Sequence, residues 1–341
     1  MDQISVILPC YNVAPYLDRC LTSLTTQTIG VERLQILCVD DASTDDTREK
    51  LREWEQRFPE NLCIIECSEN RRQGTARNIG LQYAAGKYVS FVDPDDWVEP
   101  SAFEVLLQVM EAERPQMVQC GFVRDFGDGK PDVNVGKNAS YKKMDINSGE
   151  KRSHKIALTG SEPMVWGRLL EREYLVREGL VFPEDLAYED NYWCLLLSGT
   201  IEKYCVLEAP LYHYCVNGSS TILKNNAEYH TDFLTVQLLA LEEAERRGWV
   251  NLYPDAMEFH FLHGAYLDFL KIICLRYDNP PYALFRLVQE IVGSRMMVRR
   301  DNPYYADGFT EFQKLLLGLI ECNVTKEQFR EVAVKVKSLG I

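Results

Sequence analysis

The sequence lacks the glycine-rich loops that wrap phosphates in the two commonest nucleotide-binding folds. Its first apolar segment, residues 4–8, leads into the turn 9–13, Pro-Cys-Tyr-Asn-Val, where a dinucleotide-binding fold would need Gly-x-Gly-x-x-Gly. A loop ending in Gly-Lys-Ser or Gly-Lys-Thr, which would cradle a triphosphate, is absent as well. A nucleotide bound to this chain would therefore be held by side chains and a cation rather than by backbone amides.

Long apolar runs, paired cysteines and an excess of positive charge are also missing. No apolar run approaches the ~20 residues of a membrane span, and residues 1–3 enter the first strand without the basic start of a signal peptide. The 11 cysteines include no pair with the two-residue gap of a zinc knuckle or redox motif, so we expect a reducing cytoplasm. The net charge of -14 argues against nucleic acid as a partner.

What the chain does contain is a regular alternation of apolar and amphipathic segments from residue 4 to about residue 122. Short apolar strands separated by helices of ~10–15 residues are typical of an α/β fold with a parallel sheet. The expected strands are 4–8, 34–39, 62–66, 87–92 and 117–122, and the expected helices are 15–29, one that starts near 43, 74–85 and 102–113.

The alternation ends near Arg124. Gly, Lys, Asp and Asn dominate from there to about Glu150, which predicts a mobile excursion. Helical segments with short strands are expected to about residue 222, and mainly helical periodicity follows from about residue 226. We therefore expect an α/β fold with a single mixed, mostly parallel sheet flanked by helices over residues 1–222, and a helical C-terminal subdomain over 223–341.

The most informative segment is the strand end 91–96, Phe-Val-Asp-Pro-Asp-Asp. Its three carboxylates, Asp93, Asp95 and Asp96, lie within four residues, and like charges this close repel each other unless a cation lies among them. Strand ends are where open α/β sheets place their ligands. The segment therefore predicts a divalent cation, which usually brings a phosphate with it. The alternative is a helix N-cap before Pro100, which would use only one carboxylate.

Polar side chains also follow the first two expected strands. Tyr11 follows the first strand, and Asp40 and Asp41 follow the second. If these strands are neighbours, both loops open at the same edge of the sheet. A tyrosine can stack on a base, and a carboxylate can accept a hydrogen bond from a base N–H or a ribose hydroxyl. Alternatively, Tyr11 covers the edge of the core and Asp41 caps the next helix.

Four segments together resemble the family 2 glycosyltransferases, whose GT-A fold is a nucleotide-binding α/β domain. The segments are 5–12, 39–45, 74–80 and 91–96, in the order and at the spacing of the family, and the resemblance covers roughly residues 3–125. It implies a donor-binding half over 1–125 and an acceptor side with the catalytic base over 126–222. The donor-binding residues that it implies are Pro9, Tyr11, Asn12, Asp40, Asp41, Arg77, Asp93 and Asp96.

The resemblance also assigns roles within that set. Pro9, Tyr11 and Asp41 would hold the uracil side of a UDP-sugar, and Arg77 would lie near the diphosphate or the sugar. Asp93 would face the ribose or the metal, and Asp95 would coordinate Mg²⁺ or Mn²⁺.

A second informative segment spans residues 182–193. In the family a Glu-Asp pair follows the donor domain and its Asp is the general base, a position that Asp190 matches, with Glu189 beside it. From the residues alone, the pair also reads as a solvated helix start. Residues 165–172 resemble the family's acceptor-side helix, so Trp166 either lines the acceptor pocket or is a packed core aromatic.

Residues 210–221 resemble the family's closing motif, with a departure. The motif often carries an Arg where Cys215 stands, so a cationic contact to the diphosphate is missing unless Lys224 supplies it. His213 is a candidate metal or phosphate ligand, although a lone histidine is more often structural.

The C-terminal segment has apolar residues at helical spacing and a basic cluster. Arg295, Arg299 and Arg300 flank Met296 and Met297, which would suit contact with an anionic membrane. The alternative is a helical subdomain that packs on the catalytic core or on a second copy in a homodimer.

The resemblance implies an inverting, metal-dependent glycosyltransferase. It would move a sugar from a nucleotide donor, a UDP-sugar, to a glycan or lipid-linked acceptor in bacterial surface-polysaccharide assembly, at the inner face of the cell membrane. A sugar nucleotidyltransferase would need a Gly-rich, basic loop after the first strand, which the turn 9–13 does not supply. A non-catalytic nucleotide- or glycan-binding relative is the other alternative, and it would bind UDP without transferring a sugar.

Overall fold

A computed structural model describes residues 4–126, 140–159, 164–216, 223–296 and 298–339. The chain divides into two compact units, and each is described by itself. Unit 1 consists of Met1–Ile146, Met164–Asp185 and Thr200–Asn217, and unit 2 consists of Asn147–Pro163, Leu186–Gly199 and Gly218–Ile341. The contacts therefore do not divide the chain at the expected residue 222, because two internal segments belong with the C-terminal helices.

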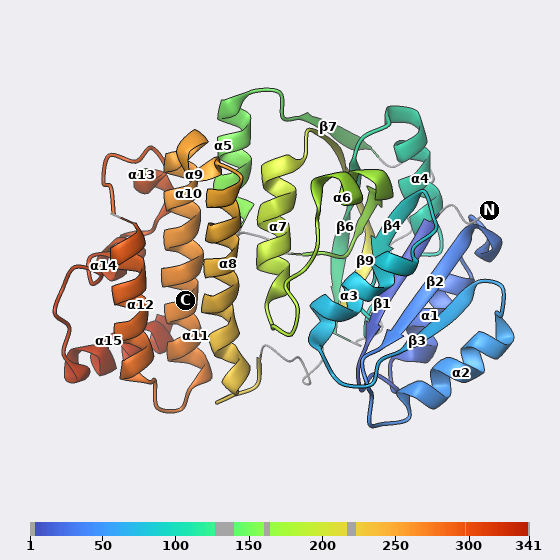
Figure 1. The fold of residues 1–341 in the computed structure, drawn as a ribbon, viewed down its shortest axis with the longest axis horizontal. Coiled ribbons are helices and arrows are strands. Elements are labelled where there is room, and N and C mark those ends of the chain that lie inside the picture. Colours follow the sequence, from blue (N-terminus) through green and yellow to red (C-terminus); the bar gives the residue numbers. More distant parts are fainter. Residues whose placement is uncertain (1–3, 127–139, 160–163, 217–222, 297, 340–341) are drawn as a thin grey trace. The chain divides into compact units, whose positions relative to one another are not determined.

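Unit 1 is built on one mixed sheet, to which the described residues contribute nine strands in the order β3-β2-β1-β4-β8-β6-β9-β5, with β7 beside β9 (Figure 1). The first four strands of this order run parallel, as the alternation in the sequence predicts. The strands are β1 Ile4–Cys10, β2 Leu34–Asp40, β3 Leu62–Glu66, β4 Tyr88–Phe91, β5 Trp97–Val98, β6 Met117–Asp125, β7 Tyr141–Asp145, β8 Arg168–Glu171 and β9 Lys203–Cys215.

The other half of the sheet mixes strand directions. Strand β8 runs antiparallel to β4 and β6, and β9 runs parallel to β6 and antiparallel to β5 and β7. Strand β7 lies within the segment that we expected to be a mobile excursion, residues 124–150, of which 127–139 are outside the described residues. Residues 141–145 of that segment form a regular strand, which the sequence did not predict.

Helices cover both faces of the sheet. They are α1 Leu17–Thr25, α2 Thr47–Arg57, α3 Arg72–Tyr83, α4 Ala102–Glu113 and α6 Arg172–Glu178, with a 3-10 turn at Val31–Arg33. Val6 and Leu8 of β1 belong to the same core as Leu21 of α1 and Phe103 of α4. Between them Ile7 faces the opposite side and contacts α3 at Gly80, where an added Cβ would overlap its side chain. Close packing of α3 on β1 therefore requires glycine at this position.

Unit 2 is helical and has its own apolar core. Its helices are α5 Gly149–Ala157, α7 Glu189–Thr200, α8 Asp232–Arg246, α9 Trp249–Leu252, α10 Pro254–Phe261, α11 Phe269–Arg276, α12 Tyr282–Arg295, α13 Tyr305–Gly308, α14 Glu311–Leu317 and α15 Lys326–Leu339, with a π-helix at Leu262–Asp268 and a 3-10 turn at Glu228–Thr231. The apolar residues at helical spacing, such as Phe261, Tyr266 and Ile273, are buried in this core. Within the described part of the chain, no helix is both long enough and apolar enough to span a membrane.

The basic cluster of unit 2 is largely paired within the chain. Arg299 contacts Asp255 and Glu258, and Arg295 lies within 4.0 Å of Glu242 and 3.8 Å of Glu245. Met297 is outside the described residues. Because nearby carboxylates offset two of the three arginines, the cluster offers less net positive charge to a membrane than the sequence suggested.

Candidate active site

The ends of β1, β2 and β4 bring most of the donor-side candidates to one edge of the sheet. Strands β1 and β2 are parallel neighbours, and Cys10 pairs with Asp40 in their register. Tyr11 and Asp41 therefore follow adjacent strand ends, and the acidic turn that begins at Asp93 follows β4 on the other side of β1. Pro9 is buried within β1, whereas Tyr11 is 44% exposed. Nearly half of the Tyr11 side chain is therefore open to solvent at this edge.

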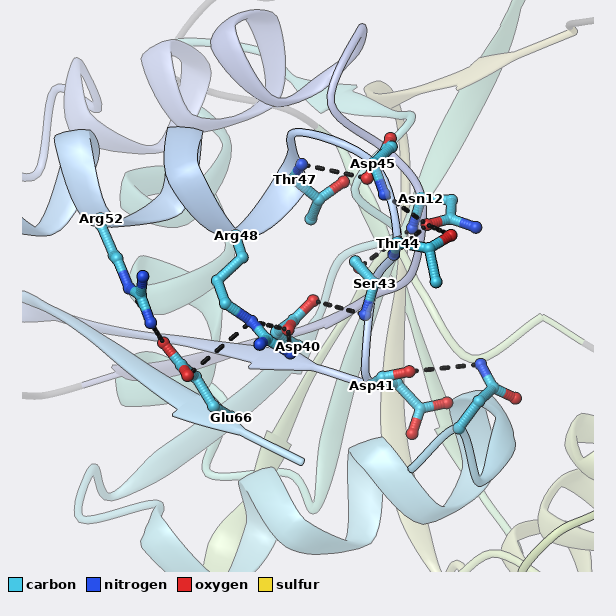
Figure 2. Close-up of polar contacts among 11 residues, drawn as sticks. Asn12, Asp40, Asp41, Ser43, Thr44, Asp45, Thr47, Arg48, Arg52 and Glu66 are labelled. Atoms are coloured by element: carbon cyan, nitrogen blue, oxygen red, sulfur yellow. Dashed lines mark hydrogen bonds and ion pairs between the residues drawn. The ribbon is translucent and has the colours of Figure 1, made fainter. Parts of the chain in front are cut away.

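Asn12 joins the loop after β1 to the loop after β2 (Figure 2). Its Oδ1 accepts hydrogen bonds from the backbone N–H groups of Thr44, at 2.8 Å, and Asp45, at 3.3 Å, and its own N–H donates to Ser43 Oγ at 3.1 Å. The residue has a φ of 53°, in the left-handed region that asparagine tolerates better than most residues. Asn12, itself exposed, thus links the two loops and fixes the backbone next to Tyr11.

Asp40 and Asp41 are both buried, and each has a different partner. Asp40 accepts hydrogen bonds from Arg48, at 2.8 Å, and from the N–H of Ser43, at 3.2 Å (Figure 2). Asp41 Oδ1 accepts from the N–H of Arg71 at 2.8 Å. Burial raises the pKa of Asp41, and the backbone N–H groups of Arg71 and Arg72 oppose that shift. The sequence did not reveal these anchors, since nothing near Asp40 marks Arg48 as its partner.

The acidic turn after β4 is closed and partly neutralised by groups of unit 1. The N–H of Asp96 donates to the carbonyl of Asp93 at 3.0 Å, which closes the turn. Arg77, whose side chain is 3% exposed, contacts Asp93 Oδ1 at 2.8 Å. The charge of Asp93 therefore already has a counterion within unit 1.

Asp96 is the innermost carboxyl group of the turn. Its Oδ2 accepts from the Tyr212 hydroxyl at 2.6 Å and its Oδ1 from the N–H of Cys215 at 2.8 Å, so both oxygens are held by β9. Burial and the charges of Asp93 and Asp95 raise the pKa of Asp96 to about 8. Asp96 therefore anchors the turn to the sheet. Asp93 and Asp96 thus have partners in the protein, Arg77 and Tyr212, while a cation within the cluster stays a prediction.

The described residues contain no group of three or more His, Cys, Asp or Glu side chains arranged to hold a metal ion. An all-protein metal cage is therefore not part of the described chain. Mg²⁺, however, is commonly bound by one or two carboxylates together with substrate phosphates and water. Asp95 and Asp93, which are separated by Pro94 in the turn, fit that second mode.

His213 is engaged inside the fold. Its Nε2 lies 2.6 Å from Glu99 Oε1, both side chains are buried, and its ring stacks on Trp97 at a centroid distance of 3.4 Å. One ring nitrogen is thus committed to a protein carboxylate. This geometry is that of a histidine with a structural role, the alternative considered from the sequence. His213 is therefore not among the residues to which we assign a metal ion.

Arg19 of α1 brings a guanidinium group to the position where Cys215 replaces the family's arginine. Its Nη2 lies 2.7 Å from Cys215 Sγ and donates to the carbonyl of Asp95 at 3.2 Å, while its Nη1 contacts Asp125 at 3.0 Å. The side chain of Arg19 is 45% exposed. Lys224, the substitute considered from the sequence, belongs to unit 2, where its carbonyl lies 2.6 Å from His230 Nε2.

Trp166 lies in an aromatic stack connected to the acidic turn. Its ring is parallel to that of Tyr212, at 4.4 Å between centroids, and to that of Tyr214, at 5.6 Å. Phe122 meets it edge-on at 5.1 Å. Trp166 is partly buried, so packing accounts for much of its surface, and Tyr212 connects it directly to Asp96.

Glu189 and Asp190 form the first turn of α7 in unit 2. Glu189 is buried, whereas Asp190 is half-buried and its Oδ1 accepts from both N–H groups of Asn191, main chain and side chain, at 2.9 Å. Carboxylates are favourable at a helix N-terminus, because the helix dipole is positive there. The pair therefore starts a helix, as the residues alone suggested, but it is not the solvated helix start expected, because Glu189 is buried.

The segment just before α7 is fixed by His230. Tyr188, which has a φ of 65°, places its hydroxyl 2.7 Å from His230 Nδ1. The other ring nitrogen faces the carbonyl of Lys224, which can only accept, so neutral His230 carries its proton on Nε2 and Tyr188 donates to Nδ1. Within unit 2 this arrangement fixes the residue that leads into Glu189 and Asp190.

Comparison with known sequences gives a consistent family. Residues 5–174, about half of the chain, match the family described as Glycosyl transferase family 2. The chain is 30% identical over 220 residues to the uncharacterized glycosyltransferase EpsJ of Bacillus subtilis, covering 64% of this chain and 62% of EpsJ. It is 27% identical over 240 residues to the minor teichoic acid biosynthesis protein GgaB of B. subtilis, covering 70% of this chain and 26% of GgaB. The chain thus spans less than two thirds of either relative.

Two solved structures share the fold. S. aureus TarS 1–349 in complex with UDP-GlcNAc is 19% identical with a TM-score of 0.55, covering 87% of this chain and 93% of that one. The mannosyltransferase PcManGT from Pyrobaculum calidifontis, in complex with GDP-Man and Mn²⁺, is 19% identical with a TM-score of 0.50, covering 99% and 84%. At these identities the likeness establishes the fold alone. It confirms the predicted class, a mixed sheet flanked by helices with a helical C-terminal region.

Proposed function

The chain belongs to glycosyl transferase family 2, and we propose that it transfers a sugar from a UDP-sugar to a glycan or lipid-linked acceptor. The observation that carries the proposal is the meeting of Tyr11, Asp41 and the acidic turn at one sheet edge, in the part of the chain that matches the family. TarS, which shares the fold, is described in complex with UDP-GlcNAc, which supports a nucleotide-sugar donor. GgaB is named for teichoic acid biosynthesis, which supports a surface-polysaccharide setting.

On the donor side, we assign Tyr11 to stacking on the base and Asp41 to a hydrogen bond with it. The exposed ring of Tyr11 and its fixed loop suit stacking, because little order is lost when the base binds. Pro9, Asn12 and Asp40 take supporting roles: Pro9 lies in the buried strand end, and Asn12 and Asp40 anchor the two loops.

We assign the diphosphate to the acidic turn. A Mg²⁺ or Mn²⁺ ion held by Asp95, with Asp93 beside it, would neutralise the charge that develops on the departing nucleoside diphosphate. PcManGT, which shares the fold, is described with Mn²⁺. Arg77 holds Asp93 in place, and the half-exposed guanidinium of Arg19 offers a second positive group next to Asp95. Arg19 therefore takes the role that the sequence left open at Cys215.

On the acceptor side, Asp190 is the proposed general base. An alcohol is a poor nucleophile, and a carboxylate within hydrogen-bond reach can take its proton as the new bond forms. The proton moves from the acceptor hydroxyl to a carboxylate oxygen of Asp190, and the hydroxyl oxygen attacks the anomeric carbon opposite the leaving group. The configuration inverts, and no covalent intermediate with the protein forms. This assignment rests on the place of Asp190 in the sequence, as does that of Glu189 beside it.

Trp166 is the proposed acceptor contact, since its partly exposed ring adjoins the stack that ends at Asp96. Contact with a membrane surface and pairing with a second copy stay predictions.

The test is a release assay over a panel of UDP-, GDP- and TDP-sugars, with Mn²⁺ supplied and then chelated. We expect release from a UDP-sugar that depends on the metal, and no release by Asp190→Asn in the presence of an acceptor glycan, with UDP binding retained. Unchanged turnover by Asp190→Asn would remove the base assignment. UDP binding without release from any donor would favour the non-catalytic relative. A triphosphate substrate that yields pyrophosphate would favour the nucleotidyltransferase.

A further inference from the structure

Helix α3 holds an irregular segment, Phe182–Asp185, along one of its faces. Asn78 forms two hydrogen bonds with the backbone of Phe182. Asn78 Nδ2 donates to the carbonyl of Phe182 at 2.8 Å, and Asn78 Oδ1 accepts from the N–H of Phe182 at 2.9 Å. Thr75 Oγ1 accepts from the N–H of Asp185 at 3.1 Å. Arg71, which caps the helix, is four residues before Thr75, and this spacing places all three side chains on one face.

Arg71 completes this attachment with a forked ion pair. Its Nε and Nη2 donate to the two carboxylate oxygens of Asp185 at 2.9 and 3.0 Å, and Nη2 also reaches Glu184 Oε2 at 2.7 Å. The fork lowers the pKa of Asp185 below its ordinary value. Two parallel N–H···O bonds fix the orientation of the carboxylate as well as its distance.

The same residue is bound to the donor side. The backbone N–H of Arg71 donates to Asp41 Oδ1, the carboxylate proposed to read the base. The main chain of Arg71 is thus fixed by the end of β2, while its side chain holds the segment that continues toward Glu189 and Asp190. This one residue joins the nucleotide edge of the sheet to the chain that carries the proposed base.

Backbone strain gathers at the same place. Of the seven described non-glycine residues with a left-handed φ, Arg72 and Asp185 lie at the two ends of this connection, and Ala42 follows Asp41. Such conformations persist only where surrounding contacts over-determine them, and they gather at functional sites. The fork and the Thr75 contact on Asp185, which has a φ of 62°, are contacts of that kind.

We propose that Arg71 is a positioning residue that ties the segment leading to the base to the donor-binding strand end, and the catalytic part of this inference rests on the proposed function. The fork is not needed to hold the fold together. Arg71, Glu184 and Asp185 are 38%, 51% and 58% exposed, and ion pairs as exposed as this add little to global stability. The fork instead fixes the end of the segment, at Asp185, against the start of α3.

The test compares Arg71→Met and Arg71→Lys with Lys142→Met, which removes an exposed ion pair with Glu208 elsewhere in unit 1. In Arg71→Met we expect kcat for sugar transfer to fall about 10- to 100-fold, since small displacements of a catalytic group cost that much. The affinity for UDP with Mn²⁺, measured by calorimetry, should change less than about threefold, because the backbone contact to Asp41 survives. The kcat of Arg71→Lys should lie between that of Arg71→Met and that of the parent chain, and the kcat of Lys142→Met should equal that of the parent chain.

A double variant separates positioning from a direct role. Asp185→Asn keeps a residue that tolerates the left-handed backbone and weakens the fork. If Arg71 acts through Asp185, the double variant that carries both Arg71→Met and Asp185→Asn should have the same kcat as Arg71→Met alone. Additive losses, or a loss of UDP affinity as large as the loss of kcat, would show that Arg71 contacts the donor itself and would overturn the proposal.

Hydrogen exchange gives a readout that does not depend on activity. The N–H of Asp185 should exchange about tenfold faster in Arg71→Met than in the parent chain, while amides of α2 and α4 stay unchanged. Unchanged exchange at Asp185 would reject the anchor. If the parent chain transferred no sugar at all, the proposed function would fail, and exchange at Asp185 would still decide whether Arg71 holds the segment.

Discussion

Removing the hydroxyl of Tyr212 should destabilise unit 1, because that one oxygen atom supports the acidic turn at two points. It donates to Asp96 Oδ2 at 2.6 Å and accepts from the N–H of Asp93 at 3.2 Å. Tyr212→Phe deletes both bonds and keeps the ring that stacks on Trp166. The side chain is 1% exposed, so water has little access to replace the lost contacts.

The size of the effect follows from the two groups that lose a partner. A buried group left without its partner costs roughly 1–3 kcal/mol. Asp96 keeps the N–H of Cys215, and its pKa is raised to about 8, so it can take up a proton and its loss lies toward the lower end. We expect a loss of about 3 kcal/mol in the free energy of unfolding. For a unit of roughly 150–250 residues this lowers Tm by about 6–12 °C.

Differential scanning calorimetry of the full chain is the assay, with Tyr83→Phe as the matched control, since Tyr83 is 56% exposed at the end of α3. The control should leave Tm within about 1 °C of the parent chain, because substitutions at exposed positions rarely matter. If Tyr212→Phe lowered Tm by less than about 2 °C, the turn would not depend on Tyr212, and the account of how its charges are relieved would be wrong.

Variants at three further positions test other parts of the molecule. Asp95→Ala should weaken Mn²⁺-dependent UDP binding, measured by calorimetry, by more than the roughly 10-fold loss seen when a residue that only supports a metal ligand is changed. If the parent chain bound UDP equally well with and without Mn²⁺, the metal assignment would be wrong. His260, buried in α10, has its pKa lowered to about 4 by burial. In the unfolded chain His260 is protonated below pH ~6.5, whereas in the folded chain it stays neutral until the pH nears 4. The free energy of unfolding therefore falls as the pH falls from ~6.5 to 4, by up to ~3 kcal/mol. Tm measured against pH should fall less steeply there in His260→Met, and identical slopes would contradict this reasoning. Asn12→Ala should lower the free energy of unfolding by about 1 kcal/mol more than Asn12→Gly does, because only glycine avoids the strain of a φ of 53°. If thermal unfolding showed equal losses, the whole effect would come from the lost side-chain hydrogen bonds and none from backbone strain.

The N-terminal half of the fold could be predicted closely from the sequence. Strand Leu62–Glu66 and helix Ala102–Glu113 lie at the expected positions, and the other early elements differ by only a few residues. Strands buried on both faces are continuous apolar runs, so the run itself marks the element. The neighbouring positions of β1 and β2, assumed when Tyr11 and Asp41 were grouped, are present as well.

The second half was harder to predict because its partners are distant in the chain. Strand β9 was expected only as one of several short strands, yet it spans Lys203–Cys215, and its edge neighbour β7 is mostly exposed and reads as loop. Tyr212 and Asp96 are 116 positions apart, and so no local pattern could show that a phenol would support the carboxyl. Repulsion among the acids was a sound argument about an isolated segment, but the folded chain supplies Arg77 and Tyr212 as partners.

The place of β9 in the sheet has a consequence for synthesis on the ribosome. It is the last strand of the described chain to emerge, yet it pairs with β6, β7 and β5, which are all made earlier. The four parallel strands can form while translation continues, whereas β6 waits for its parallel neighbour and exposes a ladder of unpaired backbone groups until residue 215 has left the tunnel. Exposed strand edges invite pairing with other chains. Nascent chains stalled shortly before Lys203 should therefore be the ones most prone to aggregate and to recruit chaperones.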